Sequence, residues 1–175
     1  MHALLRLSGL IDALTERVGR AARWLILVTV LISAGNATAR YAFNASSNAW
    51  LEVQWYLFAA VFLLCAGYAL KHQQHVRIDV ISGRLSRRAQ AWIEVFGTLV
   101  FLLPMAGLIL ALSWPVFVAS WRSGEVSANA NGLALWPARA LVPAGFALLV
   151  LQGISELLKR IAFLRGLIPD PAQKP

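Results

Sequence analysis

Four long apolar segments alternate with shorter polar stretches along the chain. They cover about residues 21–40, 50–70, 89–117 and 138–158. A helix needs about 20 mostly apolar residues to cross the hydrocarbon core of a bilayer. The pattern therefore predicts an all-α integral membrane protein with four transmembrane helices. No change of composition divides the chain, so residues 1–175 are expected to form a single membrane domain.

A shorter segment, about residues 3–19, precedes the first span and has a different pattern. Its apolar side chains recur every three or four residues, and charged side chains occupy most of the remaining helical wheel. The apolar positions are Leu4, Leu7, Ile11, Leu14 and Val18. This pattern is typical of an amphipathic helix that lies on the membrane surface. A straight extension of the first transmembrane helix is the alternative.

The third apolar segment is longer than a bilayer requires and contains two prolines. Pro104 lies near its middle and Pro115 towards its end. Proline has no backbone N–H and crowds the preceding turn of a helix. Neighbouring helices can satisfy the carbonyl groups that a proline frees. We therefore expect this helix to be tilted or kinked, with Ser86 as the N-cap at its start.

The composition agrees with burial in lipid rather than in a soluble core. Hydrophobic residues make up 59% of the 175-residue chain and charged residues only 14%, against roughly a quarter charged in soluble domains. The formal net charge of +8 would also suit a nucleic-acid ligand. However, the basic residues border the apolar segments, where they can contact anionic lipid headgroups. We therefore expect membrane lipids, and no nucleic acid, as partners.

Lysine and arginine are distributed unevenly among the predicted connections. Of the 16 basic residues, all but three fall in the N-terminal segment, the second connection and the C-terminal tail. The exceptions are Arg40, Arg122 and Arg139. Because short basic connections stay in the cytoplasm, both termini are expected to be cytoplasmic. Tryptophans at the predicted outer boundaries support this orientation, since indoles favour the membrane interface.

Charged residues inside membrane helices are costly and therefore point to function. Glu52 lies near the start of the second predicted helix, and Arg40 ends the first at a similar depth. We interpret them as an interfacial pair, with binding of a coupling ion by Glu52 as the alternative. No acid, histidine or lysine falls at the predicted bilayer midplane. A proton or cation pathway through this chain alone is therefore not expected.

The end of the second span carries His72, His75 and, a turn later, Asp79. Zinc takes three or four such ligands in a fixed geometry, and no fourth ligand is evident. The single cysteine, Cys65, lies within an apolar run and is expected to pack there. We interpret the stretch as a turnaround in which His75 and Asp79 bond to each other or to the backbone. Metal coordination is the alternative, and no metal or cofactor is expected.

The third connection, about residues 120–137, is rich in glycine, asparagine and serine, which predicts a loop. In the predicted topology it faces the periplasm. Its candidate docking residues are Glu125, Leu133 and Trp136. The sequence leaves two interpretations open, a docking surface for a periplasmic protein and a re-entrant cap on the outer face.

Two stretches of the sequence resemble a known family. "ARYAFNASSNAWLEVQWYLF" (39–58) and "HVRIDVI" (75–81) are similar to the small, DctQ-type membrane subunit of tripartite ATP-independent periplasmic (TRAP) transporters. The matching positions are Arg40, Tyr41, Asn44, Trp50, Glu52 and His75–Asp79. The resemblance spans roughly residues 20–160. The last third looks more like the mannitol/chloroaromatic-type subgroup.

The resemblance implies a non-catalytic permease subunit in the bacterial inner membrane. Its partners would be a large elevator-type membrane subunit, which imports organic acids with a sodium gradient, and a periplasmic substrate-binding protein. Sodium would bind in the large subunit and not in this chain. The small subunit would act as a scaffold. The matching residues Arg40, Asn44, Trp50, Glu52, His75, Arg77 and Asp79 would be structural or subunit-interface positions.

Other classes of protein have less support in the residues. A self-sufficient, dimeric four-helix transporter would need a membrane-embedded acid, for which Glu52 is the candidate. A haem-binding anchor subunit would need histidines within the spans, and these are not found there. No nucleophile–base set or phosphate-binding loop is evident, so no enzyme activity is expected.

Overall fold

The computed structural model of the chain describes residues 2–45, 47–72, 85–129 and 131–169. Helices account for most of these residues. They are α1 (His2–Phe43), α2 (Asn48–Lys71), α4 (Arg87–Gly97), the π-helical η1 (Thr98–Leu102), α5 (Leu103–Ser123) and α6 (Trp136–Leu164). Four helical segments are long and apolar enough to cross a membrane, which confirms the four predicted spans. The second and fourth begin two residues earlier than predicted, and the fourth continues to Leu164.

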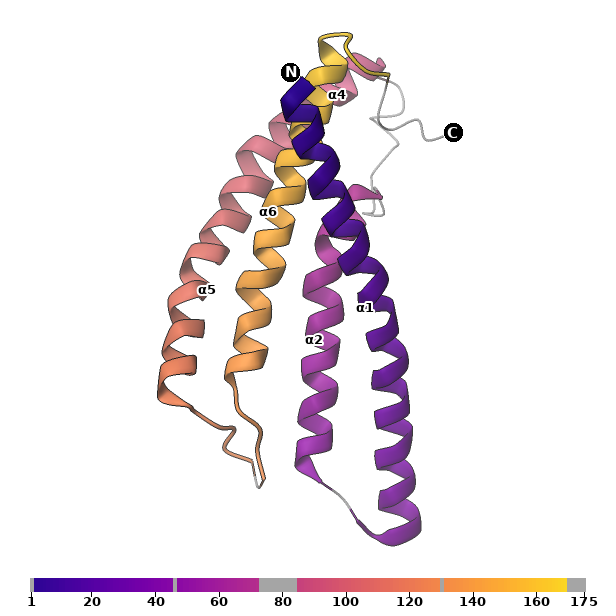
Figure 1. The fold of residues 1–175 in the computed structure, drawn as a ribbon, viewed down its shortest axis with the longest axis vertical. Helices are drawn as coiled ribbons and strands as arrows, with labels where there is room; N and C mark the ends of the chain where they lie inside the picture. The colour runs from indigo at the N-terminus through magenta and orange to yellow at the C-terminus, as the bar shows by residue number, and fades with distance from the viewer. Residues whose placement is uncertain (1, 46, 73–84, 130, 170–175) are drawn as a thin grey trace.

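The helices form one elongated bundle around α6 (Figure 1). α6 packs against α1, α2, α4, η1 and α5, whereas α5 packs chiefly against α6 and η1. The N-terminus and the end of α6 lie at the same end of the bundle, which we call the terminal end. The opposite, loop end carries the α1–α2 connection and the α5–α6 connection.

Helix α1 corrects the predicted amphipathic surface helix. It runs without interruption from His2 to Phe43, so the first 19 residues extend the transmembrane helix, as in the alternative. Of the predicted apolar face, Leu4, Leu7 and Leu14 are 43–48% exposed and Ile11 is buried. The side of α1 that packs inside the bundle is mostly small or polar. It consists of Ser8, Ile11, Thr15, Gly19, Ala22 and Thr29.

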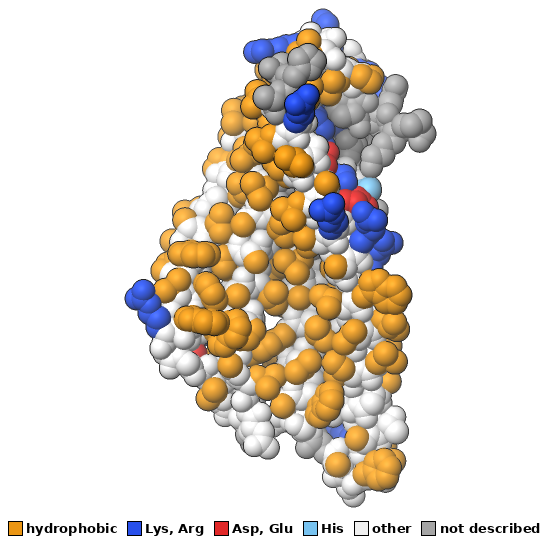
Figure 2. Space-filling model, in the orientation of Figure 1, with side chains coloured by type: hydrophobic (Ala, Val, Ile, Leu, Met, Phe, Trp, Pro, Cys, Tyr) orange, Lys and Arg blue, Asp and Glu red, His pale blue; other side chains and the backbone are white. Residues whose placement is uncertain are grey.

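The reason lies in the rules of helix packing in membranes. Lipid tails are as apolar as leucine, so large apolar side chains gain little from packing against another helix there. Small and polar side chains instead permit close approach and hydrogen bonding between helices. Across the bundle, large side chains accordingly face outward, including Trp55 (64% exposed), Phe58 (61%) and Phe62 (83%). Figure 2 shows apolar side chains covering most of one face.

The expected distortion of the third span is a short π-helical segment. η1 (Thr98–Leu102) ends just before Pro104, and the N–H of Leu103 donates to the carbonyl oxygen of Thr98 five residues back. The proline ring would clash with a carbonyl four residues back in a regular helix, and a wider π turn relieves this contact. Pro115 lies inside α5 without ending it. Ser86 caps α4 as predicted, since its Oγ accepts from the N–H of Ala89 (3.3 Å).

Glycines set the distance between α6 and its neighbours. A Cβ added to Gly145 would lie 2.7 Å from Leu63 Cβ and 2.8 Å from the Leu63 carbonyl oxygen, both in α2. Backbone atoms cannot rotate away as a side-chain tip can. The α2–α6 contact therefore depends on the absence of a side chain at this position.

Replacing Gly145 with alanine is expected to lower the free energy of unfolding by about 1–3 kcal/mol, the usual cost of overpacking. Gly107→Ala is the matched control, because no atom lies within 4 Å of its added Cβ. Thermal unfolding of both variants in one mild detergent would measure the difference. Equal midpoints would show that α2 and α6 separate without cost.

Candidate functional site

The first candidate site is Glu52, in the first turns of α2 at the loop end. Its side chain comes from a helix whose hydropathy suits a membrane, yet the residue is only 3% exposed. A buried carboxylate needs hydrogen-bond donors to offset the water that it has lost. The α5–α6 connection supplies them.

Three donors from this loop converge on the carboxylate, and we call them with Glu52 the Glu52 cluster. Oε1 accepts from Ser127 Oγ (2.5 Å) and from Asn129 Nδ2 (2.7 Å). Oε2 accepts from the backbone N–H of Leu133 (2.7 Å). Both oxygens of the carboxylate thus hold Ser127, Asn129 and Leu133 against α2.

The loop itself is ordered by further contacts. Ser127 N–H donates to the Leu133 carbonyl oxygen (2.9 Å), and Leu135 N–H donates to that of Glu125 (3.0 Å). One turn along α2 from Glu52, the Tyr56 hydroxyl donates to the carbonyl oxygen of Ala134 (3.2 Å). The α5–α6 connection is therefore a closed loop that is fixed to the first turns of α2.

The predicted pairing of Glu52 with Arg40 is wrong. Arg40 lies in the last turn of α1 and is exposed. It makes no ion pair with any residue that the structure describes. The loop donors outcompete it because they include an aligned backbone N–H and a side-chain amide that are already held in place. A guanidinium on a long side chain would instead lose rotamer entropy on pairing there.

The candidate docking residues of the loop are engaged within the chain. Glu125 forms an ion pair with Arg139 of α6. Trp136 packs edge-on against Trp121 of α5, with ring centroids 4.5 Å apart. The N–H of Leu133 belongs to the Glu52 cluster. These residues shape the loop, and docking of a periplasmic protein on it stays a prediction.

A second polar constellation joins α1 and α6 at the terminal end, and the sequence pattern did not reveal it. Asp12 Oδ1 accepts from Gln152 Nε2 (2.9 Å) and from Ser155 Oγ (2.8 Å), and Asp12 Oδ2 accepts from Lys159 Nζ (3.0 Å). Lys159 also pairs with Glu156 (2.5 Å). Gln152 and Ser155 are fully buried. We call these residues the Asp12 network.

Helix α2 joins the same region through its last residues. Lys71 Nζ donates to Glu16 Oε2 (2.7 Å) and to the carbonyl oxygen of Asp12 (3.0 Å). His72 Nε2 lies 2.9 Å from Glu16 Oε2. On the far side of α6, Arg160 pairs with Glu94 of α4. Charged pairs at this end therefore tie α2 to α1, α1 to α6, and α4 to α6.

A sequence signal for the Asp12 network did exist. Ser8, Asp12 and Thr15 share one face of a helix at spacings of four and three residues. Gln152, Ser155, Glu156 and Lys159 form a similar face in α6. Polar faces of this kind are not distinguished by hydropathy from faces that meet water, so the sequence alone does not assign them to a helix contact.

The histidine stretch is only partly described. α2 ends at Lys71, with His72 as its C-cap residue. His75, Arg77 and Asp79 lie outside the described residues, so their interpretation stays a prediction. Among the described side chains, no group of three or more His, Cys, Asp and Glu residues is placed to hold a metal ion.

The middle of the bundle differs from both ends. Each acidic side chain that the structure describes forms a hydrogen bond or an ion pair near one end of the bundle, in the contacts given above. Four helix interiors contain no Asp, Glu, His, Lys or Arg. They are residues 24–39, 53–70, 95–121 and 140–155. The interior of this bundle therefore offers no charged or imidazole group with which to coordinate an ion at mid-depth.

Four apolar helices with polar ties at both ends define a multi-pass helical membrane protein. The family model of the DctQ component of tripartite ATP-independent periplasmic transporters matches residues 29–163, which is more than half of the chain. The chain therefore belongs to the DctQ family, a family of transporter components and not of enzymes. The match is to the whole family and does not support the narrower mannitol/chloroaromatic subgroup. A comparison with curated proteins gives no match.

Proposed function

We propose that this chain is the small permease subunit of a TRAP transporter in the bacterial inner membrane. In this proposal it braces the stationary part of a large elevator-type subunit. That subunit imports organic acids with a sodium gradient after delivery by a periplasmic binding protein. The terminal end faces the cytoplasm and the loop end faces the periplasm. Membership of the mannitol/chloroaromatic-like subgroup belongs to the same proposal.

One observation carries the scaffold role. The acidic side chains that the structure describes form hydrogen bonds or ion pairs near the two ends, most of them between helices or between a helix and the α5–α6 connection. The four helix interiors contain no charged side chain. A subunit built in this way resists deformation but offers no ion or substrate site along its middle. A moving partner needs such a fixed frame, because displacement of one element requires another that stays still.

The alternative of a self-sufficient transporter rests on Glu52. Coupling by this residue would require its carboxylate to release and bind a cation. Both oxygens are occupied by three donors from the loop, so ion binding would first have to break the Glu52 cluster. This arrangement favours a structural role for Glu52.

Purification of the affinity-tagged chain from native membranes in mild detergent tests the proposal. We expect one large membrane subunit to co-purify in stoichiometric amount, identified by mass spectrometry. A chain that emerges alone as a homo-oligomer would contradict the scaffold role. It would also make ion coupling by Glu52 the next hypothesis.

A further inference from the structure

A groove of about 530 Å³ lies between α1 and α2 at the loop end. α1 supplies most of its wall, and the α1–α2 connection and the start of α2 complete it. The lining residues are Leu31, Ile32, Gly35, Asn36, Ala39, Ala45, Ser47 and Trp50. Leu31 (62% exposed) and Trp50 (52% exposed) make the groove accessible from the surrounding membrane.

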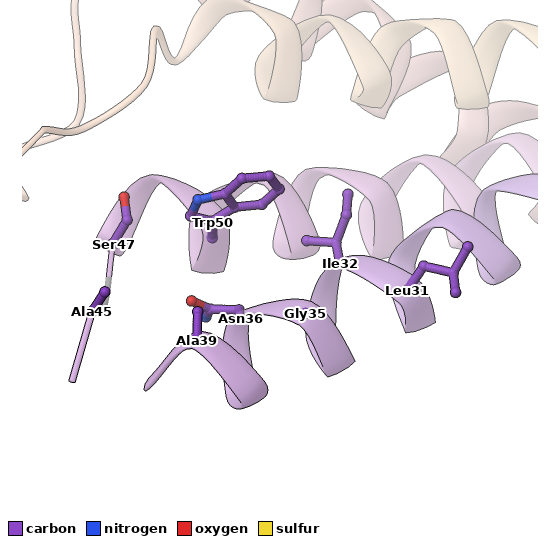
Figure 3. A pocket seen from close by; sticks show the side chains of 8 residues that line it. All are labelled: Leu31, Ile32, Gly35, Asn36, Ala39, Ala45, Ser47 and Trp50. Atoms are coloured by element: carbon purple, nitrogen blue, oxygen red, sulfur yellow. The ribbon is translucent and has the colours of Figure 1, made fainter. Parts of the chain in front are cut away.

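The groove is polar at one end and apolar at the other. Figure 3 shows the Ser47 hydroxyl, the Asn36 amide and the indole nitrogen of Trp50 near the outer end. Leu31 and Ile32 lie at the inner end. The side chain of Asn36 makes no hydrogen bond with any residue that the structure describes. An occupant with acceptor atoms near the surface and hydrocarbon below them would match this order.

A positive charge lies beyond the polar end. Arg40 follows Asn36 by four residues and so shares its face of α1. It is exposed and, within the described part of the chain, has no carboxylate partner. From Leu31 to Arg40 the helix rises roughly 13 Å at 1.5 Å per residue, which is close to half of a hydrocarbon core of about 30 Å. The site thus has the depth of one leaflet.

We propose that this groove binds one phospholipid of the leaflet at the loop end. Arg40 pairs with the phosphate, which is the complementary charge. Asn36 and Trp50 donate hydrogen bonds to the ester carbonyl oxygens, and an acyl chain follows Gly35 and Ile32 to Leu31. A transmembrane helix of another subunit would also fill the apolar part of the groove. It would place an anion beside Arg40 only if it carried an acidic residue at that depth. The phospholipid fits both features.

Native mass spectrometry of the full-length chain in mild detergent tests the inference. The probes are phosphatidylglycerol and a diacylglycerol with the same acyl chains, each titrated separately. Wild type is expected to bind one phosphatidylglycerol more tightly than any further copy. Arg40→Gln should weaken that binding about fivefold, as for loss of one exposed ion pair, and leave diacylglycerol binding unchanged.

Filling the groove is the second variant. A Cβ added at Gly35 would meet no atom of this chain within 4 Å, and the residue is exposed, so Gly35→Leu is expected to fold normally and to lose the tight phosphatidylglycerol site. Gly107→Leu is the matched control, since a Cβ added there also meets no atom within 4 Å. Equal lipid binding by the two leucine variants would overturn the proposal.

A cross-linking experiment identifies a protein occupant if there is one. Cys65 is the single native cysteine, so Gly35→Cys in a Cys65→Ser background gives one reactive position. In native membranes we expect no protein adduct with a short bifunctional cross-linker. An adduct to another membrane subunit, or to a second copy of this chain, would assign the groove to that partner and overturn the lipid site.

Discussion

Replacing Asp12 with alanine is expected to lower the free energy of unfolding of the chain by about 2–3 kcal/mol. The variant leaves Gln152, Ser155 and Lys159 without their shared acceptor. Gln152 and Ser155 are fully buried, so water cannot replace the lost bonds without opening the α1–α6 contact. Removing one partner of a buried pair costs about 3–5 kcal/mol. The Asp12 side chain is 24% exposed, and each donor keeps a second acceptor. Gln152 and Lys159 keep Glu156, and Ser155 keeps the carbonyl oxygen of Ser8. Both facts place the expected loss below that range.

Unfolding midpoints in one detergent would measure this loss, with two variants for comparison. Asp12→Asn keeps the size of the side chain and one acceptor, so it should be intermediate. Arg17→Ala removes an exposed charge from the same helix and should change stability by no more than about 0.5 kcal/mol. A double-mutant cycle with Lys159→Ala would isolate the Asp12–Lys159 coupling. If Asp12→Ala behaved like Arg17→Ala, the network would not hold α1 to α6.

The four spans could be predicted from hydropathy because a bilayer imposes a length and a composition on any helix that crosses it. Hydropathy could not predict which faces of the helices pack against each other inside the bundle. Leu4, Leu7 and Leu14 form an apolar stripe in the sequence, and the structure places these residues on the outside of the bundle. In lipid, periodicity marks a face but does not say whether that face meets lipid or protein.

The candidate site was also predicted only in part from the sequence. Glu52 stood out in the sequence because a carboxylate near a span needs partners. Its partners lie 75–81 residues away in a loop, and no periodic pattern connects a loop to a helix. The sequence therefore predicted an ion pair of Glu52 with Arg40, the nearest cation at a similar depth, and this prediction is wrong. Distant pairing also hid the Asp12 network, whose members are 140–147 residues apart.

Replacing Glu52 with glutamine is expected to release the α5–α6 connection from α2. The substitution keeps the size of the side chain but exchanges one acceptor oxygen for an NH₂ donor. In one amide orientation this donor faces the N–H of Leu133, and in the other it faces the side-chain NH₂ of Asn129. With its NH₂ towards Leu133, the glutamine places a donor against a backbone N–H that cannot turn away, which costs more than the simple absence of a bond. With its NH₂ towards Asn129, that amide must turn over to accept, and the bonds of the cluster then join neutral groups and are about half as strong as bonds to a carboxylate.

Hydrogen exchange of the peptide covering residues 124–135 would measure the release. The amides of Ser127, Leu133 and Leu135 are hydrogen-bonded in the closed loop, so their exchange should become severalfold faster in Glu52→Gln. Gln54→Leu is the matched control. Gln54 is buried two residues away, but its side chain donates, among the described residues, only to the Trp50 carbonyl oxygen of its own helix (3.2 Å). Unchanged exchange in Glu52→Gln would contradict the role of the cluster in holding the loop.

The same variant separates the two functions considered for Glu52. In the proposed transporter, a released loop should lower uptake of substrate delivered by the binding protein while the large subunit still co-purifies. Arg40→Gln should leave loop exchange unchanged, because Arg40 takes no part in the Glu52 cluster. A coupling-ion site makes a different prediction. Glu52→Gln would then abolish uptake without changing the exchange of residues 124–135, since the loss would come from the charge and not from the loop.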